Sequence, residues 1–224
     1  KRFYPKETYD SMSINNPALL HVAKKRPLLM SSTPPPPLLP DGHLILVALD
    51  NELPLPKLLA VDPGGRRALI GVGKINAAYH TLKAIIEFKP RLLINFGTAG
   101  ALSDGLDDLV EVGHVVQRDI DLRPMGFSLG TTPYDPLSDG LVLAGTGVTC
   151  GSGDDFVDSP PELTCDIVDM ELYAIAKVAA REGVALRAFK YISDRADDSA
   201  PADWKEGLTK AADCFLSRLP HLSL

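Results

Sequence analysis

Two carboxylates, Glu171 and Asp194, stand beside apolar segments, where ionisable side chains are rarely buried without a partner or a task. Glu171 precedes a run in which Leu172 and Ile175 recur at helical spacing, and Asp194 follows the apolar stretch 184–192, which is typical of a buried strand. Two acids that converge at one edge of a sheet could divide general acid catalysis and charge stabilisation between them. The simpler alternative is that Glu171 favours a helix N-terminus and Asp194 caps the next turn.

A third acid, Glu52, follows the first strongly apolar segment of the chain. Residues 43–49 (HLILVAL) form a continuous apolar run, which is typical of a central parallel strand, and Asp50-Asn51-Glu52 come directly after it. Open α/β sheets bind their ligands beyond the carboxyl ends of strands. The position of Glu52 is therefore consistent with a binding site.

Small and aromatic residues follow two other predicted strands. The strand 91–96 runs into Gly97-Thr98-Ala99-Gly100, whose small side chains would let a ligand approach the backbone closely and whose amides could form an anion-binding nest. The alternative is a tight turn between strand and loop. A glycine-rich loop, 151–157 (GSGDDFV), follows the predicted strand 141–148 and ends with Phe156 and Val157.

Strands and helices alternate along the chain from residue 43 onward. The predicted strands are 43–49, 68–72, 91–96, 112–117, 141–148 and 184–192, and the predicted helices are 75–88, a helix starting near 171, and 202–219. This order predicts an α/β fold, with one domain over 43–224 and a mixed, largely parallel central sheet flanked by helices. Residues 1–42, which include a run of four prolines, are expected to be an extension, either flexible, partner-binding or added for expression.

Composition excludes several classes of function. The 224 residues carry a net charge of −6, which disfavours nucleic acid and anionic membrane surfaces as partners. No apolar run approaches the roughly 20 residues of a membrane span. Three cysteines without CxxC spacing and five scattered histidines indicate neither a disulfide framework nor a metal site, so we expect no metal, no cofactor and a cytoplasmic location.

Two glycine motifs resemble nucleotide or hydrolase signatures but fail their tests. Gly71-Val72-Gly73-Lys74 follows a strand, yet Asn76 occupies the place of the third small residue of a dinucleotide fingerprint. A phosphate-binding P-loop would need glycine and serine or threonine where the chain has Ala68 and Ile75. Gly151-Ser152-Gly153 is not the GxSxG of serine hydrolases.

Four motifs in one order resemble those of the nucleoside phosphorylase/nucleosidase superfamily, and most closely the 5′-methylthioadenosine/S-adenosylhomocysteine nucleosidases. They span about residues 43–219 and are the segments 95–100 (NFGTAG), 152–157 (SGDDFV), 168–171 (VDME) and 192–194 (ISD). The resemblance implies a nucleoside phosphorylase-like fold that cleaves the N-glycosidic bond of a purine nucleoside and releases the free base.

The resemblance also implies a role for each matched residue. Asp194 would be the general acid at purine N7, Glu171 would bind the ribose hydroxyls, and Glu52 would take a proton from water. The expected substrate-binding residues are Phe156 against the purine, Val157 at its edge, Met170 against the sugar, Thr98, Ala99 and Gly100 around the ribose, and Ser193.

Hydrolysis is favoured over phosphorolysis by the same comparison. The phosphorylases hold phosphate with arginines after the first strand and near the NxGxAG strand, where this chain has an acidic loop ending in Glu52 and the neutral Asn95. The expected substrate is a 5′-modified adenosine such as methylthioadenosine or S-adenosylhomocysteine, together with water.

The chain departs from the family in two short segments, 53–70 and 126–147, so the 5′ substituent stays open. The charged run 118–123 is expected either to line the pocket in their place or to be a solvated loop. Another purine nucleoside or nucleotide as substrate, and a non-catalytic nucleoside-binding protein, remain alternatives. The family resemblance implies a homodimer or a higher homo-oligomer.

Overall fold

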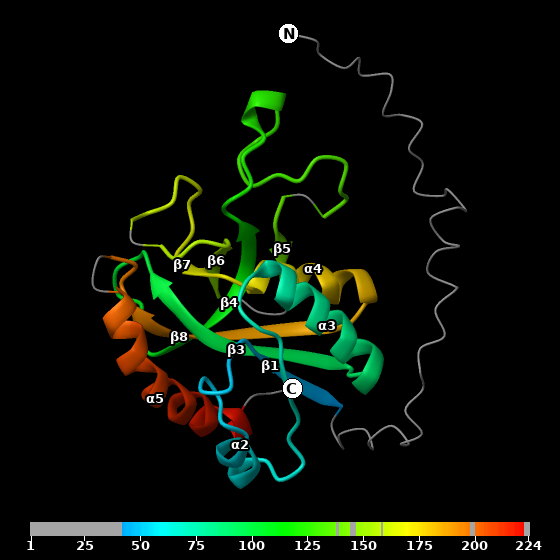
Figure 1. Ribbon diagram of the computed structural model, residues 1–224, viewed down its shortest axis with the longest axis vertical. Helices are drawn as coiled ribbons and strands as arrows, with labels where there is room; N and C mark the ends of the chain where they lie inside the picture. Colours follow the sequence, from blue (N-terminus) through cyan, green and yellow to red (C-terminus); the bar gives the residue numbers. More distant parts are fainter. Residues whose placement is uncertain (1–41, 138, 144–146, 158, 198–199, 222–224) are drawn as a thin grey trace. The chain divides into compact units, whose positions relative to one another are not determined.

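The computed structural model describes residues 42–137, 139–143, 147–157, 159–197 and 200–221 (Figure 1). Of the predicted extension 1–42, all but Gly42 lies outside the described residues. The strands are β1 (His43–Val47), β2 (Arg67–Leu69), β3 (Leu92–Ala101), β4 (Leu109–Gln117), β5 (Leu141–Val142), β6 (Val148–Ser152), β7 (Ile167–Asp169) and β8 (Ala185–Asp194). The α-helices are α2 (Leu55–Val61), α3 (Lys74–Phe88), α4 (Leu172–Glu182) and α5 (Ala200–Arg218), with 3₁₀ turns at Arg123–Met125 and Leu219–His221.

One mixed sheet contains the eight described strands, and part of it closes on itself. Strand β8 pairs with both β3 and β4, and β4 continues through β6 and β7 back to β3, so these five strands form a ring. Five pairings are parallel and three are antiparallel, those of β3 with β7, β4 with β5 and β4 with β8. The predicted α/β fold with a mixed, largely parallel sheet is therefore confirmed.

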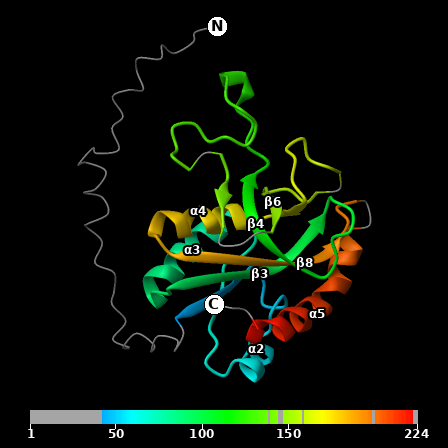
Figure 2. The same cartoon turned by 180° about the vertical axis from the view of Figure 1, so that it is seen from behind.

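Helices cover the sheet on both sides, as the two opposite views show (Figures 1 and 2). Helices α3 and α4 pack together on one side, and α5 packs on β8 on the other. Apolar side chains of each helix fill the space against the strands, which forms two core clusters. In the α5 cluster the ring of Phe96 from β3 stacks on that of Phe215, with centroids 4.3 Å apart. No helix of the described residues is long and apolar enough to cross a membrane.

The predicted end of the strand 91–96 was wrong. Strand β3 continues through the small residues to Ala101, because Gly97, Thr98 and Ala99 keep pairing with β8. The register slips between Ala99 and Gly100, and beyond the slip Gly100 pairs with Asp194. The slip is a bulge of the kind found beside functional sites, and it brings the end of β8 to the end of β3.

Other differences concern short elements. The predicted strand 141–148 is two strands, β5 and β6, which pair with β4 in opposite directions. Helix α2 and the three-residue strand β7 were not predicted, because segments this short carry too few residues for a periodic pattern to be recognised.

Candidate active site

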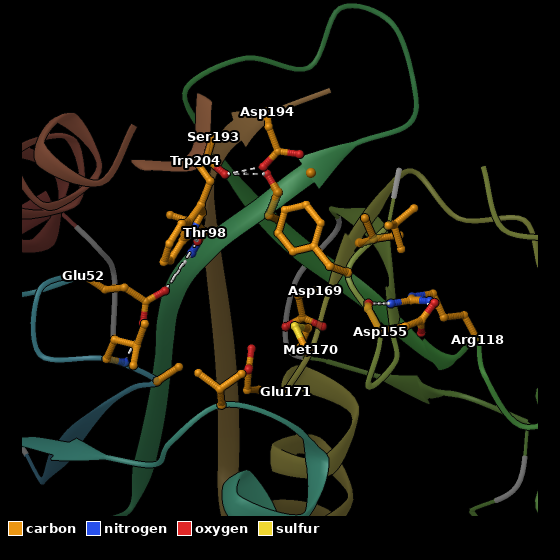
Figure 3. A pocket seen from close by; sticks show the side chains of 18 residues that line it. Glu52, Thr98, Arg118, Asp155, Asp169, Met170, Glu171, Ser193, Asp194 and Trp204 are labelled. Atoms are coloured by element: carbon orange, nitrogen blue, oxygen red, sulfur yellow. Dashed lines mark hydrogen bonds and ion pairs between the residues drawn. The ribbon is translucent and has the colours of Figure 1, made fainter. Parts of the chain in front are cut away.

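A cavity of about 250 Å³ lies where β1, β3, β6, β7 and β8 end (Figure 3). Every residue that the sequence nominated for the site contributes to its lining: Glu52, Thr98, Ala99, Gly100, Phe156, Val157, Met170, Glu171, Ser193 and Asp194. Arg118, from the charged run expected either to line the pocket or to be a solvated loop, also contributes, and seven further lining residues were not nominated: Ala48, Leu49, Val72, Asp155, Val168, Asp169 and Trp204. The structure thus brings the predicted site residues together, and it adds charged and aromatic groups to them.

Glu52 is buried and held at both carboxylate oxygens. Its Oε2 accepts a hydrogen bond of 2.9 Å from the amide of Leu49, and its Oε1 accepts one of 3.2 Å from the amide of Thr98. The Thr98 hydroxyl oxygen lies 3.5 Å from the same Oε1. Burial raises the pKa of Glu52, although these amides and the Lys190 ammonium favour its ionised form. A carboxyl group with a raised pKa and a fixed orientation is suited to accept a proton.

Asp194 is fixed at the end of β8 by its sequence neighbours. The Ser193 hydroxyl donates to its Oδ2 at 2.7 Å, and the amide of Ala196 donates to its Oδ1 at 3.0 Å. A Cβ at Gly100 would lie 2.7 Å from Oδ1, so the carboxyl group can occupy this place because residue 100 has no side chain.

Glu171 immediately precedes α4 and accepts a hydrogen bond from another helix terminus. The amide of Gly73, the N-cap residue of α3, donates to its Oε1 at 2.9 Å. Burial and the neighbouring Asp169 carboxylate raise the pKa of Glu171 to about 7. Glu171 is the N-cap residue of α4, as the simpler alternative expected, but its side chain makes no capping hydrogen bond to α4 and instead accepts from Gly73.

A buried ion pair, Lys190 with Asp169, lies at the same site. Lys190 on β8 and Asp169 at the end of β7 are 2.7 Å apart, and their side chains are only 2% and 1% exposed. Asp169 also accepts a hydrogen bond of 2.5 Å from the Ser152 hydroxyl. Burial works against ionisation of Asp169, but the Lys190 ammonium, the Ser152 hydroxyl and the Leu172 amide together lower its pKa. Asp169 lies within the VDME motif, whereas Lys190 sits in an apolar run and gave no local signal.

Phe156 and Val157 line the cavity from the loop after β6, which Arg118 holds in place. Arg118 at the end of β4 has a 4% exposed side chain, and its guanidinium donates to the Asp155 carboxylate at 2.7 Å and to the Asp155 carbonyl at 2.5 Å. Of the charged run 118–123, which was expected to line the pocket or to be a solvated loop, Arg118 alone lines the cavity. Arg123 instead pairs with Asp121 and Glu162 on exposed side chains.

The glycine motif 71–74 holds protein carboxylates. Next to the Gly73 amide that holds Glu171, the amide of Lys74 donates to Asp154 Oδ1 at 2.7 Å. The Lys74 ammonium bonds to Asp119 and lies 3.4 Å from Asp154 Oδ2. These contacts join the start of α3, the end of β4 and the loop after β6, close to the lining residues Val72, Arg118 and Asp155.

The lining as a whole is acidic. Five carboxylates contribute to it, those of Glu52, Asp155, Asp169, Glu171 and Asp194. Arg118 is the only basic side chain among the lining residues that the structure describes, and it is paired with Asp155. Within the described ranges no group of three histidine, cysteine or acidic side chains could hold a metal ion. Acids of this kind in a largely apolar cavity can move protons to and from an uncharged, partly apolar ligand.

Comparison with known proteins places this geometry in a family. The family described as "Phosphorylase superfamily" matches residues 64–139 and 128–219. A 5′-methylthioadenosine/S-adenosylhomocysteine nucleosidase of Staphylococcus haemolyticus is 33% identical over 167 residues, which is 63% of this chain and 73% of that protein. A nucleosidase of the same name from Marinomonas is 30% identical over 172 residues, covering 64% of this chain and 73% of the relative.

Solved structures agree with the sequence comparison. The Neisseria meningitidis nucleosidase of the same name, in complex with methylthio-immucillin-A, has a TM-score of 0.69 and 25% identity, over 80% of this chain and 96% of that one. A futalosine hydrolase mutant of Helicobacter pylori has a TM-score of 0.72 at 22% identity, over 80% of this chain and 96% of that one, and shares the fold. The chain belongs to the phosphorylase superfamily.

Proposed function

We propose that this protein is a purine nucleosidase that hydrolyses the N-glycosidic bond of a 5′-modified adenosine, such as methylthioadenosine or S-adenosylhomocysteine, and releases adenine. The observation that carries the proposal is the convergence of Glu52, Glu171 and Asp194, all buried, on one cavity in a chain whose relatives are named as such nucleosidases. Asp194 caps the turn after β8 through the Ala196 amide and Glu171 is the N-cap residue of α4, but both also line the same cavity, which capping alone does not explain.

Each acid has a separate role in the proposed reaction. Asp194, as the carboxylic acid, donates a proton to N7 of the purine, so that the bond between C1′ and N9 breaks with a neutral base as leaving group. Glu52 takes a proton from the water whose oxygen bonds to C1′. Glu171 binds the ribose hydroxyls and stabilises the positive charge that develops on the sugar. Figure 3 shows Asp194 at one end of the cavity, with Glu52 and Glu171 toward the other.

The remaining lining residues suit the parts of a nucleoside. Phe156 supplies an aromatic face for the purine, and Val157 follows it at the edge of the base. Met170 packs against the sugar, and Thr98, Ala99 and Gly100 surround the ribose and the attacking water. Ser193 orients the Asp194 carboxyl group through its 2.7 Å hydrogen bond.

The charge of the cavity supports water rather than phosphate as the nucleophile. Phosphorolysis needs cationic donors for a phosphate dianion. Arg118, the only basic lining residue among those described, already pairs with Asp155, and Glu52 occupies the loop after β1. A phosphate at this site would be repelled by the acidic lining and would find no unpaired basic side chain among the described lining residues.

The activity is tested by measuring adenine release from methylthioadenosine in phosphate-free buffer. Wild-type protein is expected to release adenine without phosphate, and Asp194→Asn and Glu52→Gln are each expected to lower kcat by roughly 10²- to 10⁴-fold. Asp213→Asn is a matched control, because this exposed acid pairs with Lys57 and does not line the cavity. A requirement for phosphate would contradict the hydrolase assignment.

The same assay with a panel of nucleosides identifies the substrate. Adenosines with methylthio, homocysteinyl and carboxylated 5′ substituents, together with 6-oxopurine nucleosides, test the 5′ end and the base separately. Tight binding of an adenine nucleoside, without turnover of any member of the panel, would instead support a non-catalytic nucleoside-binding protein.

We also infer a cytoplasmic homodimer or higher homo-oligomer. An apolar stripe on α3, made of Ile75, Tyr79 and Ile86, is exposed by 82%, 63% and 60%. These residues recur at helical spacing on the side of α3 opposite to its buried residues. A contiguous apolar surface of this kind is typical of an interface. The free cysteines Cys150, Cys165 and Cys214 support a reducing compartment.

A further inference from the structure

Trp204 contacts the site through its indole nitrogen as well as through its ring. It is the only tryptophan of the chain and lies in α5, on the wall of the cavity. Its Nε1 donates a hydrogen bond of 2.9 Å to the Thr98 hydroxyl oxygen on β3. The same hydroxyl oxygen lies 3.5 Å from Oε1 of Glu52, in the loop after β1 (Figure 3).

The chemistry of the three groups determines the direction of this chain of hydrogen bonds. An indole N–H can only donate, and an ionised carboxylate can only accept. The Thr98 hydroxyl has one proton, so while it accepts from Trp204 its own proton is directed at Glu52. Without the indole donor the hydroxyl could rotate toward another acceptor, and Glu52 would lose this donor while it keeps the backbone amides of Leu49 and Thr98.

We propose that Trp204 is a positioning residue that acts on Glu52 through the Thr98 hydroxyl, in a relay of three groups from α5, β3 and the loop after β1. The inference rests on the proposed function, in which Glu52 is the base that accepts a proton from water. The relay holds the Oε1 side of the carboxylate in place and favours its ionised form, which is the form that can accept the proton.

A second reading of Trp204 would be a purely apolar wall. A phenylalanine would supply such a wall equally well, but it has no donor for Thr98. The charged groups that face Glu52 from other elements are Lys190 of β8 and Glu171 before α4, and both stay in place when Trp204 is changed to phenylalanine. The Trp204→Phe substitution therefore isolates the N–H group.

A double-mutant cycle tests the relay by activity. Trp204→Phe is expected to lower kcat roughly three- to tenfold, the effect of one lost hydrogen bond, with little change in KM. The acidic limb of the pH profile of kcat is expected to move to higher pH, because Glu52 loses support for its charge. In a Thr98→Val background the same substitution should have no further effect, whereas in a Thr98→Ser background, which keeps the hydroxyl, the effect should persist.

A second measurement does not depend on activity. The protein has a single indole N–H resonance in a ¹H–¹⁵N spectrum, because it has one tryptophan. This resonance is expected to shift as Glu52 titrates, and the shift should vanish in Glu52→Gln and in Thr98→Val. Circular dichroism and Tm of each variant establish that it is folded.

The results separate the two hypotheses. An indole resonance that does not follow Glu52, or an equal loss of kcat from Trp204→Phe with and without the Thr98 hydroxyl, would overturn the relay. If wild-type protein cleaves no nucleoside of the panel, the proposed function fails, and the indole titration still decides whether the three groups are coupled.

Discussion

Glu171 is the residue at which function and stability most clearly oppose each other. The residue is only 9% exposed and its carboxyl group stands beside Asp169, so the folded protein holds its proton more tightly than the unfolded chain does. The pKa rises from 4.5 to about 7 on folding. Ionising Glu171 at neutral pH therefore lowers the free energy of unfolding, whereas an uncharged residue at this position would not.

This shift predicts a stability difference between wild type and Glu171→Gln that depends on pH. Below about pH 4.5 the carboxyl is protonated in both states and its contribution is fully present. Between about pH 4.5 and about 7 the folded protein binds more protons than the unfolded chain, so the free energy of unfolding of wild type falls as pH rises. The fall is up to about 3 kcal/mol.

Urea unfolding of both proteins at pH 4.5 and 8 measures this difference. The glutamine variant cannot ionise at this position, so it should gain stability relative to wild type as pH rises. Glu52, Asp169 and Lys190 are present in both proteins, so the comparison isolates Glu171. A constant difference at all pH values would contradict the raised pKa.

At the scale of elements, Lys74 holds three separate segments around the cavity. Its ammonium joins the start of α3 to Asp119 after β4 and to Asp154 in the loop after β6. Its side chain is 15% exposed, so these pairs are less screened than ordinary surface ion pairs. The segments carry Val72, Arg118 and Asp155 to the cavity wall.

Lys74→Met is expected to raise KM severalfold, because the ion pairs that hold together the segments around the cavity are lost, while kcat changes less. The expected loss of stability is about 1 kcal/mol. Lys57→Met is a matched control, because its exposed partner Asp213 lies outside the cavity lining. Steady-state kinetics and Tm of both variants check this, and a loss confined to kcat would contradict a shaping role.

At the scale of the whole molecule, the apolar stripe on α3 would link the proposed oligomer to the site. The N-cap residue of the same helix, Gly73, donates to Glu171, so a partner bound along α3 would brace an element that touches the proposed active site. The stripe of Ile75, Tyr79 and Ile86 projects away from the buried face of the helix.

Tyr79→Lys and Ile75→Glu are expected to convert the proposed oligomer to monomer, because charges in an apolar interface lose their hydration without gaining partners. Sedimentation velocity of wild type and variants measures this. Val142→Glu is a control of similar exposure, 83%, on a different element, β5. Sedimentation as a monomer by the wild type would contradict the proposal.

The sequence by itself determined the order of the main strands and helices, and it nominated residues that the structure brings to one cavity. Apolar runs such as 43–49 can be recognised locally, and residues placed directly after such runs, Glu52 and Asp194 among them, must lie at strand ends. The motifs 95–100, 152–157 and 168–171 could be recognised because each is continuous in the chain.

Only the tertiary structure decided how these ends meet. The ring forms because β8 pairs with β3 on one side and with β4 on the other, and no local pattern encodes a choice of partner so distant in sequence. The same pairing buries Lys190 against Asp169, whereas in the sequence Lys190 is one charge in an apolar run. Trp204 likewise looks like a core residue of α5 until its indole N–H meets Thr98, 106 positions earlier, because a hydrogen bond depends on where two side chains lie in space.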